Sequence, residues 1–225
     1  MNPTVRGWLE VLAIVVLLPV GTTAGALTGI TIMGSLLGVG LPLVAATLFL
    51  RREGTGWSSL YAGSPLSMVK VLRWTLLTII SVWLVVQLAS LVLVKLGVPP
   101  ANYDIFVFLI EDNLLNYLLF LGPVAWGSAA VGEELLARGF LLHRIESLSN
   151  TAIAVILQAI LFAAAHAYQG WMGVISIFLL AIIFGIVYIR CGRHLLPLIL
   201  AHGIIDSISL TLVYLGHADW LTGAG

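Results

Sequence analysis

The feature that most constrains the fold of this chain is a stretch of 40 residues, 11–50, without a single charged side chain. A helix that crosses the hydrocarbon core of a bilayer needs about 20 apolar residues, so this stretch is long enough for two crossings. Residues 74–94 form a second uncharged run of 21. Over the whole chain 60% of the residues are hydrophobic and 9% are charged, with a mean hydropathy of +1.11. Such a composition is typical of an integral membrane protein and not of a soluble domain.

Glycine, proline and charged residues divide the apolar sequence into about seven predicted spans. Glu111, Asp112 and Asn113 interrupt a further apolar segment, 102–122. We expect this segment to form an interfacial or re-entrant helix on the outer side of the membrane. The predicted fold is therefore an all-α, polytopic transmembrane helix bundle. The spans are predicted near residues 8–28, 30–50, 72–95, 124–147, 151–168, 171–189 and 195–215.

The positions of lysine and arginine predict the orientation of the bundle, because cytoplasmic loops are enriched in these residues. With the N-terminus inside, nine of the 10 fall on the cytoplasmic side and Lys95 falls outside. The formal net charge is zero, so the composition gives no indication of a nucleic-acid partner. The nine are Arg6, Arg51, Arg52, Lys70, Arg73, Arg138, Arg144, Arg190 and Arg193.

A few ionisable side chains fall inside the predicted spans. Each costs a few kcal/mol at bilayer depth, so such residues usually face a cavity or mark a functional path. With a rise of 1.5 Å per residue, Glu133 lies roughly 21 Å from the cytoplasmic end of its helix and His166 roughly 24 Å from the same surface. His202 and Asp206 lie at roughly 10 and 16 Å. We therefore expect these groups, with Glu134 and Arg138, to form one site.

The spacing within this group indicates which of its members pair with one another and which is left unpaired. Glu134 and Arg138 are four residues apart with the acidic residue first, the favourable order for a helical ion pair. His202 and Asp206 also share one helix face. Glu133, about 100° round the helix from Glu134, is left free. A carboxylate beside an imidazole can accept a proton from water and return it to a leaving amine, and a second imidazole can donate to an oxyanion. We therefore hypothesise that Glu133 activates water with the help of His166.

Three motifs carry a family resemblance. Glu133-Glu134-x-x-x-Arg138-Gly139-Phe140, Phe162-x-x-x-His166 and His202-x-x-x-Asp206, on successive hydrophobic helices, resemble the CPBP family of intramembrane glutamic endopeptidases. This family includes the type II CAAX prenyl endopeptidases and the bacterial Abi proteins. The resemblance covers about residues 124–210.

The resemblance implies a role for each motif residue. Glu133 would be the general base and His166 would orient the same water, while Glu134 and Arg138 would support them. His202 would belong to the oxyanion hole. Asp206 stands where the prenyl endopeptidases of this family have an asparagine, which can donate a hydrogen bond, whereas an ionised aspartate only accepts. Asp206 would thus be either protonated or an orienting partner of His202. Ala137 stands where the family often has phenylalanine, which predicts a roomier pocket.

From these arguments we expect residues 1–100 to form N-terminal transmembrane helices and residues 101–225 to form a catalytic core. We expect an intramembrane protease, without cofactor or metal, in the cell membrane of a prokaryote. Its partners would be membrane lipid and a protein or peptide substrate that enters from the membrane. The sequence does not indicate the substrate or the oligomeric state.

Two other functions remain open at this point. Glu133, Glu134, His166 and His202 are plausible Zn²⁺ ligands, which would make the protein a membrane metalloprotease, although no His-Glu-x-x-His element is present. Alternatively, the same polar cluster could serve a non-enzymatic membrane protein, such as an immunity or binding protein. Variants of Glu133 and His166 would distinguish these possibilities.

Overall fold

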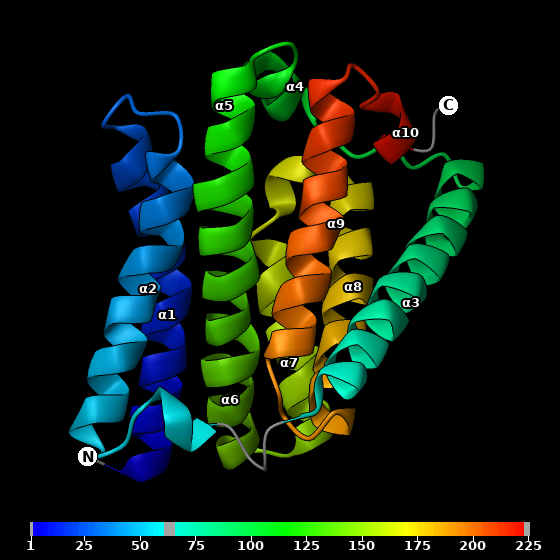
Figure 1. The fold of residues 1–225 in the computed structure, drawn as a ribbon. Coiled ribbons are helices and arrows are strands. Elements are labelled where there is room, and N and C mark those ends of the chain that lie inside the picture. Colours follow the sequence, from blue (N-terminus) through cyan, green and yellow to red (C-terminus); the bar gives the residue numbers. More distant parts are fainter. Residues whose placement is uncertain (1, 61–65, 223–225) are drawn as a thin grey trace.

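The computed structural model describes residues 2–60 and 66–222, and within these ranges every regular element is a helix (Figure 1). Six helices are long and apolar enough to cross a membrane, which confirms the predicted all-α bundle. A seventh apolar helix, α7 (Thr151–Ala164), is shorter. The six are α1 (Pro3–Ala26), α2 (Met33–Arg52), α3 (Met68–Lys95), a central helix (Leu114–Leu148), α8 (Gly170–Arg190) together with the preceding turn η4 (Ala167–Gln169), and α9 (Leu196–Tyr214).

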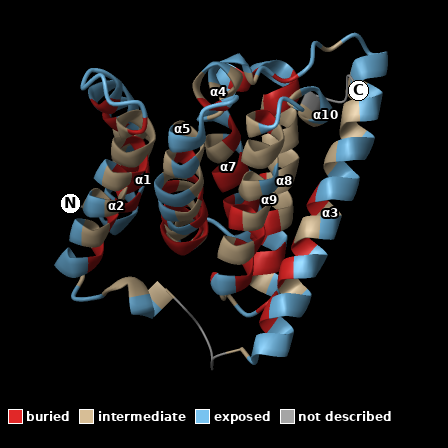
Figure 2. Cartoon of the chain, turned by 45° about the horizontal axis from the view of Figure 1, so that its top comes forward, coloured by how far each residue is buried: buried red, intermediate tan, exposed pale blue. Residues whose placement is uncertain are grey.

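The central helix is built from four consecutive segments and carries the glutamate motif. They are α5 (Leu114–Leu119), η2 (Phe120–Glu133), η3 (Leu135–Leu141) and α6 (Leu142–Leu148). Both η2 and η3 are π-helical, with i→i+5 hydrogen bonds, a winding that is rare and is found frequently at functional sites. The hairpin of α1 and α2 lies on one side of the central helix, and α7, α8 and α9 lie on the other (Figure 1). Buried residues are concentrated where these helices face one another (Figure 2).

The segment 102–122 differs from its predicted form as one interfacial or re-entrant helix. Its first part forms the short helix α4 (Asp104–Ile110), while its second part forms the first turns of the central helix. The break has a local cause. Asp112 adopts a left-handed backbone conformation with φ of 55°, and the Asn113 side chain then caps the next helix by accepting from the Asn116 amide at 3.1 Å. The predicted helix 124–147 therefore begins earlier, at Leu114.

Helix α7 begins as predicted but ends early. Asn150 caps its first turn by accepting from the Ile153 amide at 3.0 Å. The α-helix ends at Ala164, and the chain continues through η4 to Gly170, whose φ of 75° favours glycine. His166, predicted inside a helix that extends to residue 168, thus lies in the turn between α7 and α8.

Glycines allow α1 and α2 to approach closely. A Cβ atom added at Gly21 would overlap the backbone carbonyl of Leu37, and one added at Gly25 would overlap that of Met33. Small residues permit such contact between membrane helices, where dispersion and backbone proximity replace the hydrophobic effect. Because of this packing, α1 and α2 form a tight pair that lies beside the central helix.

Candidate active site

The predicted ion pair between Glu134 and Arg138 is present in the middle of the bundle. Arg138 Nη1 donates to Glu134 Oε1 at 2.8 Å, and both side chains are fully buried. Arg138 Nη2 also donates to the Ala181 carbonyl of α8 at 3.3 Å. A buried charge is tolerated when it is paired and hydrogen-bonded, and Nη1 and Nη2 of Arg138 and Oε1 of Glu134 meet this condition.

Aromatic rings enclose this ion pair on two sides. The guanidinium carbon of Arg138 lies 4.9 Å from the centroid of the Phe162 ring and 5.0 Å from that of Phe184. A cation over an aromatic face is attracted by the ring quadrupole, more strongly where water is excluded. Gln158 extends the polar network because its Nε2 donates to the same Ala181 carbonyl at 3.1 Å. Helices η3, α7 and α8 are thereby joined through one arginine.

His202 connects this pair to α9. Its Nδ1 lies 2.9 Å from Glu134 Oε1, so Glu134 accepts from both Arg138 and His202. On the other side of the ring, Nε2 lies 3.6 Å from Asp206 Oδ2. His202 is therefore placed between two carboxylates, while Asp206 remains partly exposed. Sequence reasoning placed His202 and Asp206 on one face but did not predict the contact with Glu134.

Glu133 and His166 line one cavity of about 50 Å³. This space is large enough for more than one water molecule, since about 10–15 Å³ of such volume holds one. Glu133 is half-buried and forms no hydrogen bond or ion pair with a described residue. Ala137, predicted to leave room in the pocket, lines the same cavity. Glu133 and His166, which were expected at matching depth on consecutive helices, thus line the same cavity.

The hydrogen bond of His166 defines the chemistry of its ring. Nδ1 lies 2.9 Å from the Phe162 carbonyl oxygen. A carbonyl oxygen can only accept, so Nδ1 carries the proton and Nε2 of the neutral ring has an available lone pair. Glu133 and His166 also interact electrostatically with Asp206, which places the cavity and the His202 network in one site. The arrangement combines a carboxylate, an acceptor imidazole and a second imidazole beside a space for water.

The structure adds residues that sequence reasoning did not include. Tyr168 lies within electrostatic range of Glu133 and Asp206, and its position two residues after His166 was an available signal. Tyr103, in the loop before α4, lies near Asp206. Burial raises the pKa of its phenol, and the Asp206 carboxylate adds to the rise, so Tyr103 stays a hydrogen-bond donor. No local pattern marked Tyr103, because it reaches the site from a distant loop.

Helix α1 also contributes to the cavity, through Ile14, Val15 and Leu18. Its sequence is uniformly apolar, so nothing in its pattern distinguishes a cavity wall from a face that contacts lipid.

The helix bundle and the polar site that its apolar helices enclose place this protein in the class of integral membrane proteins with an intramembrane site. Residues 115–208 match the family model described as type II CAAX prenyl endopeptidase Rce1-like. The matched region contains all three motifs and confirms the resemblance to the CPBP and CAAX proteases. This similarity indicates a protease of the CAAX type at the level of the matched family. Comparison with curated proteins and with solved structures finds no significant match.

Proposed function

We propose that the protein hydrolyses a peptide bond of a membrane-associated protein or peptide, and that Glu133 activates the attacking water. The observation that carries this proposal is the shared cavity of Glu133 and His166. A general base has to lie within hydrogen-bond reach of the water it deprotonates, and an otherwise unpaired carboxylate beside a cavity of water size meets that requirement.

In this mechanism Glu133 takes a proton from water while the water oxygen attacks the carbonyl carbon. His166 accepts a hydrogen bond from the same water through Nε2. When the tetrahedral intermediate collapses, Glu133 returns the proton to the leaving nitrogen, which yields a new carboxyl terminus and a free amine. The water thus supplies both the hydroxyl and the proton, and the carboxylate is regenerated.

His202 is the proposed oxyanion donor. Because His202 lies between the carboxylates of Glu134 and Asp206, its ring can carry a proton on both nitrogens; Nδ1 then donates to Glu134 and Nε2 is left to donate to the oxyanion. Asp206 lies beside this atom, which favours the orienting role over the donor role that the family's asparagine would have. Arg138 and Glu134 act as positioning residues, because they hold His202 without facing the cavity lined by Glu133.

We further propose that residues 101–225 form the catalytic core, that the N-terminus faces the cytoplasm, and that the membrane is the cell membrane of a prokaryote. Substrate would then enter from the lipid phase.

The decisive test compares the wild-type protein with Glu133→Gln, expressed at equal levels in the same membrane. The C-termini of the membrane proteome are identified by mass spectrometry in both. Loss of general-base catalysis lowers the rate by about 10²–10⁴-fold, so the termini produced by this protein should disappear while its thermal stability is unchanged. Undiminished cleavage by a folded Glu133→Gln protein would refute the proposal.

Two further measurements separate the alternatives. Among the described residues no three His, Cys, Asp or Glu side chains are placed to hold one metal ion, so the geometry does not favour a metalloprotease using Glu133, Glu134, His166 and His202. Activity that is abolished by a chelator and restored by Zn²⁺ would reverse this ranking. If Glu133→Gln and His166→Ala both retain the biological activity of the protein, the polar cluster serves binding or immunity instead.

A further inference from the structure

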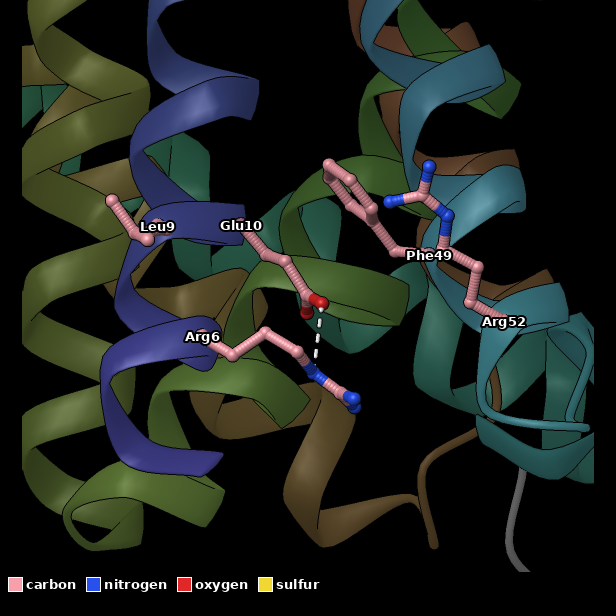
Figure 3. Close-up of a pocket in the computed structure, with 5 residues that line it drawn as sticks. All are labelled: Arg6, Leu9, Glu10, Phe49 and Arg52. Atoms are coloured by element: carbon pink, nitrogen blue, oxygen red, sulfur yellow. Dashed lines mark ion pairs between the residues drawn. The ribbon is translucent and has the colours of Figure 1, made fainter. Parts of the chain in front are cut away.

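A second and larger pocket lies away from the candidate active site, at the end of the bundle where α1 begins and α2 ends. Its volume is about 230 Å³, and its lining combines two arginines, a glutamate and two apolar side chains (Figure 3). Arg6, Leu9 and Glu10 come from α1, and Phe49 and Arg52 come from α2. Figure 3 shows Arg6 and Glu10 extending from α1 toward Phe49 and Arg52.

The charges around this pocket leave an excess of positive charge. Glu10 and Glu53 are both engaged by arginines: Arg144 lies 2.9 Å from Glu10 and 3.0 Å from Glu53, and Arg6 pairs with both. Arg52 forms no hydrogen bond or ion pair with a described residue, although it lines the pocket. Three arginines therefore face two glutamates, and the guanidinium of Arg52 remains available for an anionic ligand.

The surface that continues from the pocket along α1 is apolar and exposed. Leu9, Leu12, Val16 and Val20 follow the i, i+3, i+4 spacing of one helix face, and all four are exposed in the bundle. A ligand that fits this surface carries an anionic group for the arginines and a long apolar portion for the stripe. A phospholipid has both parts in this order, whereas a free phosphate ion would use the arginines alone.

We propose that this pocket binds the head group of an anionic phospholipid, with its phosphate against Arg52 and Arg6 and an acyl chain along the exposed face of α1. Basic pockets between membrane helices near a bilayer surface bind lipid head groups in this way. An anionic lipid is favoured over a zwitterionic one because the excess positive charge of the pocket would otherwise stay uncompensated. The site is separate from Glu133 and does not depend on the proposed peptidase activity.

The test uses the full chain in detergent and counts bound lipids by native mass spectrometry. Dioleoyl phosphatidylglycerol and dioleoyl phosphatidylcholine are titrated separately. Arg51→Gln is the matched control for Arg52→Gln, since Arg51 is its exposed neighbour at the same helix end but does not line the pocket. Removing one arginine near a membrane surface should weaken binding of the first phosphatidylglycerol about fivefold in Arg52→Gln, with little change in Arg51→Gln.

Further measurements distinguish a lipid phosphate from a free phosphate ion as the ligand. Leu9→Gln should weaken phosphatidylglycerol binding by removing the apolar contact, and millimolar inorganic phosphate should not displace the lipid. Equal losses in the two arginine variants, or equal binding of the two lipids, would overturn the proposal by indicating unspecific attraction. Full displacement by inorganic phosphate would also overturn it, since the ligand would then be the free ion.

Discussion

Glu133 and Glu134 are adjacent in the chain but have different surroundings. Glu134 is fully buried and accepts from Arg138 and His202, so its charge is compensated and its position is held. Glu133 points into a cavity and forms no comparable pair with a described residue. The difference follows from the helix, which turns consecutive side chains about 100° apart. Glu134 is therefore suited to holding its neighbours in position, and Glu133 is suited to proton transfer.

Arg138 should be required for the stability of the bundle. We expect Arg138→Met to destabilise the protein by about 3–5 kcal/mol, because it leaves the buried carboxylate of Glu134 without its main partner. Arg138→Lys should cost less, since an ammonium can still pair with Glu134 but cannot also replace the bond to the Ala181 carbonyl. Unfolding in detergent, followed by circular dichroism, measures both. A melting curve of Arg138→Met equal to that of wild type would contradict this assignment.

The part of this network that could be predicted from sequence is the part with local spacing. Glu134 and Arg138 are four residues apart, and helix geometry alone brings them together. The contact between His202 and Glu134 joins residues 68 positions apart, and it depends on how α9 packs against the central helix. A helix pattern gives the face on which His202 lies but not the residue it meets, so this bond could not be inferred.

At the scale of elements, the wall of the candidate active site includes a helix outside the family match. The match begins at residue 115, whereas Ile14, Val15 and Leu18 of α1 line the cavity with Glu133 and His166. The proposed catalytic groups thus come from the matched region, and part of the apolar boundary of the cavity comes from the N-terminal hairpin. This division suggests that α1 adjusts which substrates reach Glu133.

Leu18 offers a test of this role for α1. We expect Leu18→Trp to narrow the cavity and lower kcat/KM by about tenfold or more, because a difference of one methylene in an apolar pocket already changes kcat/KM by about 10–200-fold. Leu12→Trp is the matched control, since Leu12 lies on the same helix, is exposed and does not line the cavity. The assay is the cleavage of the substrate identified through Glu133→Gln. Equal kcat/KM values for the two variants would contradict a role for Leu18 in the cavity wall.

Element boundaries were the less predictable part of the fold. Hydropathy predicted the helices, because a run of about 20 apolar residues with few charges is typical of a membrane-spanning helix. The break at Asp112 and the early end of α7 depend instead on a left-handed backbone at one residue and on the turn at His166. The polar residues 111–113 indicated an interruption, but not that the central helix restarts directly after it.

At the scale of the whole molecule, ion pairs join the N-terminal hairpin of α1 and α2 to the central helix. These ion pairs lie at the end of the bundle where α1 begins. Successive long helices alternate in direction (Figure 1), so the beginning of α1, the end of α2 and the end of α6 meet there. Glu53 follows α2 and contacts Arg6 of α1 and Arg144 of α6. Arg52, which lines the proposed lipid pocket, directly precedes Glu53 in the chain. The same few residues therefore attach the hairpin and border the pocket.

Glu53 should make the stability of this attachment depend on acid. Hydrogen bonds from Arg144 hold the pKa of its carboxyl below the ordinary value of 4.5, against the opposing effect of burial. A carboxyl whose pKa is lowered on folding contributes stability that is present above the unfolded pKa and is lost as the pH falls through the folded one. We therefore expect the thermal stability of the wild type to drop below about pH 4.5 as this carboxylate is protonated.

Glu53→Gln separates this contribution from that of the other carboxylates. The variant should be less stable than the wild type at pH 7, because Arg6 and Arg144 lose a charged partner, and its melting temperature should fall less between about pH 5 and pH 3. Glu111→Gln, an exposed position at the other end of the bundle, should keep the wild-type slope. If Glu53→Gln retains the full acid dependence, the attachment of the hairpin does not rest on Glu53, and the pairing of Arg144 with Glu10 would have to hold α1 to the central helix alone.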